Sequence, residues 1–258
     1  MTRGVSFARR VGAPVVFGVL FLLGWQAFVD VQHIPRYLLP SPSAIGVELS
    51  QNLDDVTAAT IASGTNALVG LVVGVLLAVL VAMLAARAPF IEQLLSPLAT
   101  GVSAMPIVAL APVLATMFSA TSDLPRRIVV VIVVFFPVFV NTVRGLTRID
   151  PVHAELMRSY AAGSWDLTRV VRLPGAVPYV FTGVRVASSL AVISAVVAEY
   201  FGGLQNGLGS RITSAASNTA YARAWAYVVA AILLGLVFYL AALGAERAAT
   251  SRRGVRHG

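Results

Sequence analysis

Long runs without a charged side chain constrain the fold of this chain more than any other feature. One such run extends from Val56 to Ala86 and a second from Gln93 to Ser122. A helix needs about 20 consecutive apolar residues to cross a membrane, so each run is long enough for a span. Hydrophobic residues make up 58% of the 258 residues and charged residues only 12%, unlike a soluble globular domain. The sequence therefore predicts an all-α polytopic membrane protein.

Six segments are expected to cross the membrane within one transmembrane domain, residues 1–258. The predicted spans are 11–30, 64–86, 94–118, 126–143, 178–201 and 224–245. The first follows Arg3, Arg9 and Arg10, but it is too long for a signal peptide and no small-residue cleavage site closes it. The third is expected to bend, because Pro106 and Pro112 remove backbone donors. Gly70 and Gly74 form a G-x-x-x-G pair, which allows close helix contact.

The arginines predict the orientation of the chain. All nineteen basic residues are arginine. With six spans and the N-terminus inside, thirteen arginines fall on the inner side, five on the outer side, and Arg185 within the fifth span. An excess of positive charge on the cytoplasmic side is the rule for membrane proteins. We therefore expect both termini in the cytoplasm.

The residues 150–174, here called the 150–174 segment, form the one long polar interruption of the chain. Asp150-Pro151 suits a helix start, and Ala162-Gly163-Ser164 is a natural break between two short helices. Leu173-Pro174 is expected to stop the second helix. Apolar residues recur at roughly helical spacing, which indicates a hydrophobic face that another protein must cover. These residues are Leu156, Tyr160, Leu167, Val170 and Val171.

This segment also resembles a known family. Glu155, Ala161, Val171, Leu173 and Pro174 fall on the spacing of the signature E-A-A-x3-G-x9-I-x-L-P of ABC-importer permease subunits. Leu156 and Met157 replace its two alanines, Ala161 its glycine and Val171 its isoleucine. Four further stretches resemble the nitrate/sulfonate/taurine branch of that family. They are YLLPSPS from Tyr37, MPIVALAP from Met105, FFPVFVNTVRGL from Phe135 and PYVFTGVRVASSLAVISAVVAEYFGG from Pro178.

The resemblance implies a type I ABC-importer permease-like fold whose 150–174 segment docks onto a cytoplasmic ATPase. Tyr160 and Trp165 suit a protein–protein contact because aromatic anchors favour such surfaces, and packing onto the chain's own helices is the competing interpretation. The residues expected to couple to the ATPase are Glu155, Tyr160, Ala161, Gly163, Trp165, Asp166, Val171, Leu173 and Pro174. The candidates for the translocation pathway are Met105, Pro106, Ser194 and Glu199.

The implied partners are ABC ATPase subunits, a second permease copy in a homodimer, a periplasmic or lipid-anchored substrate-binding protein, and membrane lipids. The implied location is the bacterial cytoplasmic membrane. The solute is expected to be a small organic or inorganic anion such as a sulfonate, taurine or nitrate. A vitamin precursor, pyrimidine or riboflavin, is the alternative solute. A secondary transporter is the alternative class, but it calls for repeated helices and ion sites at mid-bilayer, and no convincing inverted repeat is visible.

Several chemistries are excluded or not expected. A chain without lysine has no Walker A loop, so ATP is expected on a partner subunit, and no catalytic residue or cofactor is predicted. With no cysteine, the chain has no disulfide and no thiolate metal site, and no metal is predicted. The arginines are dispersed between apolar runs, which does not suit nucleic-acid binding.

Four isolated polar residues have two readings each. Glu199 is expected to be a water-wetted carboxylate at the interface rather than a substrate or proton group. Arg185 either snorkels to the inner headgroups or pairs with the 150–174 segment. Asn66 and Asn141 are expected to bridge helices rather than to bind solute.

Overall fold

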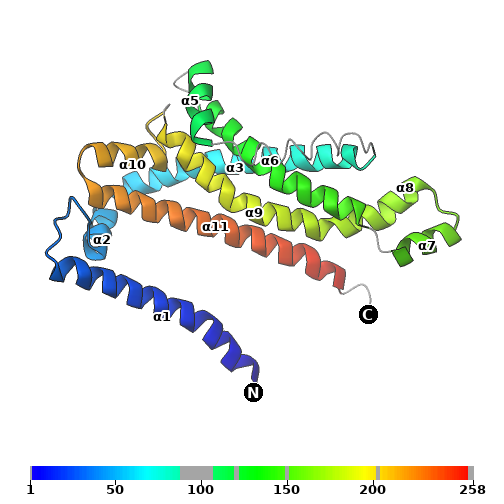
Figure 1. Ribbon diagram of the computed structural model, residues 1–258, viewed down its shortest axis with the longest axis horizontal. Coiled ribbons are helices and arrows are strands. Elements are labelled where there is room, and N and C mark those ends of the chain that lie inside the picture. The colour runs from blue at the N-terminus through cyan, green and yellow to red at the C-terminus, as the bar shows by residue number, and fades with distance from the viewer. Residues whose placement is uncertain (1, 88–106, 119–121, 149–150, 202–203, 255–258) are drawn as a thin grey trace.

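The structure is a computed structural model that describes residues 2–87, 107–118, 122–148, 151–201 and 204–254. All elements in these ranges are helical (Figure 1). They are α1 (Thr2–Val31), α2 (Pro42–Gln51), α3 (Leu53–Ala85), α5 (Ile107–Met117), α6 (Leu124–Thr147), α7 (Pro151–Ser159), α8 (Ser164–Leu167), the π-helical turn η1 (Thr168–Arg172), α9 (Leu173–Tyr200), α10 (Leu208–Ser217) and α11 (Tyr221–Gly254).

Five helical stretches in the described ranges are long and apolar enough to cross a membrane. They are Gly12–Val31, Leu53–Ala85, Leu124–Thr147, Ser164–Tyr200 and Tyr221–Thr250. Each contains the core of a predicted span. The predicted third span, 94–118, lies largely outside the described residues, and its described part forms α5. The helices around spans 64–86 and 178–201 begin earlier than predicted, because charged residues limit burial in lipid but do not interrupt a helix.

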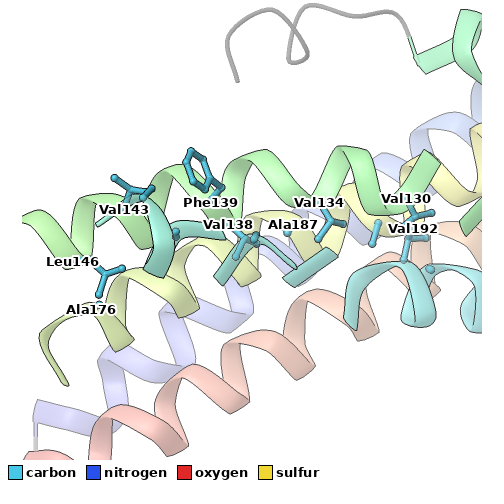
Figure 2. Packing of buried hydrophobic residues seen from close by; sticks show 14 of the residues in the cluster. Val130, Val134, Val138, Phe139, Val143, Leu146, Ala176, Ala187 and Val192 are labelled. Atoms are coloured by element: carbon cyan, nitrogen blue, oxygen red, sulfur yellow. The ribbon is translucent and has the colours of Figure 1, made fainter. Parts of the chain in front are cut away.

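The core lies where α6 passes between α3 and α9. Val130, Val134 and Val138 recur at every fourth position of α6 and are completely buried (Figure 2). The facing helices present small residues at the same spacing, which lets backbones approach closely in a membrane protein. On α3 these are Gly70, Gly74, Ala78 and Ala82, and on α9 they are Gly183, Ala187, Ala191 and Ala195.

The contact between α3 and α6 leaves no space for a side chain at either glycine. A Cβ atom on Gly70 would lie 2.4 Å from Val130 Cβ, and one on Gly74 would lie 2.8 Å from Val134 Cγ1. The close helix contact predicted from the G-x-x-x-G pair is therefore confirmed.

The remaining helices attach around this core. α1 lies apart from the bundle (Figure 1), and the Trp25 ring contacts the Trp225 ring of α11 with centroids 5.4 Å apart. α2 is joined to α11 by an ion pair of 3.1 Å between Glu48 and Arg223. α10 and α2 lie at the end of the molecule opposite α7 and α8 (Figure 1).

Arg185 and Asn141 have partners that the sequence did not predict. Arg185 does not pair with the 150–174 segment: its Nη1 lies 3.1 Å from Glu246 Oε2, and this ion pair joins α9 to α11. Snorkelling of Arg185 to the inner headgroups stays a prediction. Asn141 donates its side-chain hydrogen bond to Pro137 O of its own helix, at 2.7 Å. Pro137 lies inside α6, and because proline has no N–H, the carbonyl that loses its donor is that of Val133, four residues earlier. The bond from Asn141 goes to a different carbonyl and stays within α6.

Candidate functional site

The 150–174 segment projects from one end of the bundle, beyond the ends of α6 and α9 (Figure 1). Its first half is α7, which begins at Pro151; Asp150 lies outside the described residues. Its second half begins with α8 at Ser164. The break predicted at Ala162-Gly163-Ser164 is therefore confirmed.

The turn between α7 and α8 has the geometry of a Schellman helix end. Ala162 N donates to Met157 O at 3.0 Å, and Ala161 N donates to Arg158 O at 2.9 Å. This motif requires a left-handed residue at the position of Ala161, which is ordinarily glycine. Ala161 indeed has a φ of 52°. The geometry explains in physical terms why the signature that the segment resembles carries glycine at this place.

Replacing Ala161 by glycine should therefore stabilise the turn. An alanine Cβ in the left-handed region is strained by about 1 kcal/mol relative to glycine. We expect Ala161→Gly to slow amide hydrogen exchange at Tyr160 and Ala162 by roughly fivefold. Ala154→Gly in the body of α7 is the matched control and should speed exchange in that helix, because glycine weakens a helix interior. Equal effects of both substitutions would contradict the assignment of strain to Ala161.

The second half of the segment runs into the bundle without a break. Gly163 N donates to Asp166 Oδ2 at 3.3 Å, so Asp166 satisfies a free donor at the start of α8. α8 continues through η1 into α9. The stop predicted at Leu173-Pro174 is wrong: the wider π-helical turn, in which Leu173 N reaches Thr168 O, lets the chain pass through Pro174 as a helix.

The segment exposes apolar side chains that would need a partner in water. Tyr160 is 75% exposed and Trp165 56% exposed, although Arg87 Cζ lies 5.0 Å from the Trp165 ring centroid. Leu173 packs partly against the core, and Val171 is half-buried. Trp165 contacts the chain through Arg87, but most of its side chain stays exposed. The assignment of Tyr160 and Trp165 to a protein–protein contact stays a prediction. The exposed apolar residues of the segment are Val152, Leu156, Tyr160, Trp165 and Val170.

A buried polar cluster lies at the other end of α9, around Glu199. The Glu199 side chain is completely buried. Its Oε2 accepts from Ser63 Oγ at 2.6 Å and from Gly209 N at 3.2 Å. Its Oε1 accepts from Asn66 Nδ2 at 3.5 Å. Ser63 Oγ also accepts from Leu208 N at 2.8 Å. The carboxylate thus joins α9 to α3 and to the first turn of α10.

The cluster continues through the first turn of α6. Arg127 Nε donates to Asn66 Oδ1 at 3.0 Å, and Asp123 lies within ion-pair distance of Arg127 and Arg126. Arg126 is 2% exposed and also donates to Asn206 Oδ1 at 2.9 Å and to Leu204 O. Two carboxylates and two guanidinium groups balance in charge. Glu199 and Arg126 are buried, and buried ions need such partners, whereas Asp123 and Arg127 are partly exposed. The Glu199 cluster comprises Ser63, Asn66, Asp123, Arg126, Arg127, Glu199 and Asn206 with the N–H groups of Leu208 and Gly209.

The structure corrects one reading of Glu199 and supports one of Asn66. Glu199 is not wetted, because Ser63, Asn66 and the first turn of α10 enclose it. Asn66 bridges helices as predicted. Ser194 is buried and donates to Leu190 O of its own helix at 2.7 Å, while Met105 and Pro106 lie outside the described residues. The assignment of these four candidates to a pathway stays a prediction.

Most partners of Glu199 were missing from the sequence-based site. Ser63 and Asn66 lie 136 and 133 residues away in sequence, and no spacing rule links them. In the described ranges no group of three or more His, Cys, Asp or Glu side chains is placed to hold a metal ion.

Comparison with known proteins shows clear relatives. Residues 70–252 match the family described as "Binding-protein-dependent transport system inner membrane component". A riboflavin transport system permease protein of Chloroflexus aurantiacus is 37% identical over 207 residues, 80% of this chain and 76% of the relative. The protein named "Putative aliphatic sulfonates transport permease protein SsuC" of Escherichia coli is 30% identical over 243 residues, 91% of this chain and 88% of the relative.

A solved structure shares the fold. The crystal structure of an amino acid ABC transporter with histidines contains a chain that matches with a TM-score of 0.64 at 15% sequence identity. The match covers 78% of this chain and 97% of that chain. At this identity the likeness describes the arrangement of helices alone.

Proposed function

The chain belongs to the family of binding-protein-dependent transport system inner membrane components, the permease subunits of ABC importers, and we propose that it forms the membrane pathway for a small organic or inorganic anion. Such a permease works with ABC ATPase subunits and a substrate-binding protein. Its several apolar helices make it a multi-pass membrane protein.

The observation that carries the proposal is the exposed apolar surface of the 150–174 segment. The three short helical pieces and the turn after α7 place four apolar side chains at the end of the bundle, all at least half exposed: Leu156, Tyr160, Trp165 and Val170. Exposed apolar side chains beside charged ones are typical of a surface that a partner covers. We assign this surface to the ATPase subunit, with Glu155, Ala161, Gly163, Asp166, Val171, Leu173 and Pro174 shaping it.

The chain itself supplies no ATPase site in this proposal. ATP binding and hydrolysis belong to the partner subunit, because a sequence without lysine has no Walker A loop. The arginine excess supports a cytoplasmic side for the 150–174 segment and for both termini. In Figure 1 the C-terminal end of α11 lies toward the same end of the molecule as α7 and α8, which supports that orientation.

Two copies of the chain would enclose the pathway, with lipid around them. Movement of the two 150–174 segments as the ATPases close would tilt the helices and open the pathway alternately to each side. The binding protein would deliver the solute at the opposite end, where α2 and α10 lie.

The solute class is supported by the similarity to SsuC, whose printed name states aliphatic sulfonates and which covers 91% of the chain. A vitamin precursor is the second candidate, because a relative 37% identical is a riboflavin permease. Reconstituting the chain with its co-purifying ATPase and binding protein separates the two. ATP-driven uptake of taurine or an alkanesulfonate supports the anion, and uptake of riboflavin without either anion supports the vitamin.

Replacing Trp165 by alanine tests the docking surface. A central aromatic contact in an interface commonly contributes about 2 kcal/mol, which is roughly thirtyfold in affinity. We therefore expect Trp165→Ala to raise the concentration of ATPase needed for half-maximal binding to the membrane-embedded permease by roughly thirtyfold. Tyr37→Ala, which removes another exposed aromatic side chain from the loop before α2, is the matched control and should leave that concentration unchanged. Unchanged ATPase binding by Trp165→Ala would rule out this surface.

A further inference from the structure

One continuous helical rod connects the 150–174 segment to the Glu199 cluster. α8, η1 and α9 follow one another without interruption from Ser164 to Tyr200, a stretch of 37 residues. Its first turns carry Trp165 and its last turn carries Glu199. A continuous helix is stiffer than a loop, so this stretch forms a physical connection between its two ends.

The last turn of the rod is held to α3 and α10 by hydrogen bonds, whereas the middle of the rod is joined to α11 by the Arg185–Glu246 ion pair. Along its middle, α9 contacts α3 and α6 through small residues such as Ala187 and Ala191. Contacts of this kind bring backbones close but hold no specific angle or register by hydrogen bonding. At Glu199 the carboxylate instead accepts charge-assisted bonds from α3 and from α10, and such bonds are strong and directional.

Two glycines at the start of α10 show how closely this helix packs against the Glu199 side chain. A Cβ on Gly207 would lie 2.2 Å from Glu199 Cδ, and one on Gly209 would lie 2.9 Å from Glu199 Cβ. Leu208 and Ser210, on either side of Gly209, are buried at 0% and 1% exposure. The start of α10 is therefore seated on Glu199 rather than resting on the surface.

We propose that Glu199 is a positioning residue that fastens the far end of this rod to α3 and α10, so that displacement of the 150–174 segment is passed to α10. The proposal rests on the proposed function, because it assumes that ATPase subunits move the segment. The transmitted motion reaches the end of the molecule at which a binding protein would deliver solute. Without the carboxylate, the rod would still move, but α10 would not follow it.

The first test measures the seating of α10 directly. The chain has no cysteine, so a single introduced cysteine reports on one place. Ser210→Cys puts a thiol at a buried position of α10, and Ser217→Cys puts one at an exposed position of the same helix. Adding Glu199→Gln should speed modification of Cys at 210 by a membrane-impermeant maleimide at least tenfold, because buried bonds to a charged group are lost. Modification at 217 should stay the same.

The second test measures how tightly solute uptake is coupled to ATP hydrolysis. A general loss of packing would not lower this ratio while leaving the basal ATPase rate unchanged. Glu199→Gln should lower the solute taken up per ATP hydrolysed at least tenfold, while the basal ATPase rate of the complex stays unchanged. Glu199→Asp keeps the charge and should recover part of the ratio. Ser188→Ala is the matched control: this serine is buried on the same helix, and within the described residues its hydroxyl bonds Arg185 O of that helix, so the ratio should not change.

The outcomes separate the inference from the function on which it rests. If the unsubstituted complex takes up no solute with ATP, the proposed function fails, and the labelling experiment still tests Glu199. If uptake is normal and Glu199→Gln retains both the uptake ratio and slow labelling at 210, the inference is wrong. Should Glu199→Gln not reach the membrane, Ser63→Ala replaces it. In that variant, slow labelling at 210 and an unchanged uptake ratio would equally overturn the inference.

Discussion

Replacing Gly70 by alanine should lower the stability of the protein by about 3 kcal/mol, the upper end for overpacking a well-packed core. The added Cβ would lie 2.4 Å from Val130 Cβ, 2.5 Å from Val130 Cγ1 and 3.2 Å from Arg127 O. Neither the branched side chain nor the backbone oxygen can move away without separating α3 from α6. We expect the midpoint of thermal unfolding in detergent to fall by roughly 6–12 °C, measured by the loss of the monodisperse peak in size-exclusion chromatography.

Gly64→Ala is the matched control on the same helix. Its Cβ would meet only the tip of the Leu234 side chain, at 3.4 Å from Cδ1. This substitution should leave stability unchanged or raise it by up to about 1 kcal/mol, because alanine favours a helix over glycine. Equal losses from both substitutions would show that helix flexibility, not the contact with Val130, explains the effect.

The close contact illustrates what the sequence could predict. The run from Val56 to Ala86 identified a span, and the spacing of Gly70 and Gly74 identified a close helix contact. Neither observation named α6 as the partner, because periodicity describes one helix at a time. The small residues of α9 at Gly183, Ala187 and Ala191 were present in the sequence with the same spacing, but such stripes are common in apolar helices.

The 150–174 segment was predictable in outline and not in detail. The break at Ala162-Gly163-Ser164 followed from turn chemistry and is confirmed. Pro174 misled the prediction because proline usually ends a helix, whereas η1 widens the preceding turn enough for the helix to continue. The left-handed conformation of Ala161 was not visible either, because alanine gives no local sign of it.

The surroundings of Glu199 were the least predictable part. A carboxylate near the end of an apolar run is ordinarily wetted, and the sequence supported that reading. The enclosing groups come from α3, α6 and the start of α10, and two of them are more than a hundred residues distant. Asp123 lies just before the predicted span 126–143 and Arg126 begins it, and nothing in the sequence linked either of them to Glu199. Only the folded arrangement brings these opposite charges to the Glu199 cluster, where Arg126 is buried and Asp123 stays partly exposed.

At Gly209, the contact between α10 and α9 leaves no room for a side chain. A Cβ there would lie 2.1 Å from Val196 O, 2.9 Å from Glu199 Cβ and 3.0 Å from Tyr200 N. Two of these three atoms belong to the backbone of α9, so no side-chain rotation relieves the overlap. Gly209→Ala must therefore lift the first turn of α10 from α9 and stretch the 3.2 Å bond from Gly209 N to Glu199 Oε2.

We expect Gly209→Ala to cost about 3 kcal/mol of stability and to speed maleimide labelling at Ser210→Cys by at least tenfold. Gly175→Ala is the matched control, because no atom lies within 4 Å of its Cβ position and it sits in the first turns of α9. That substitution should be neutral or slightly stabilising, with slow labelling at 210. A stable Gly209→Ala protein with slow labelling would mean that α10 can shift without leaving Glu199. The contact between α10 and the Glu199 carboxylate would then be too loose to pass a displacement of the rod on to α10.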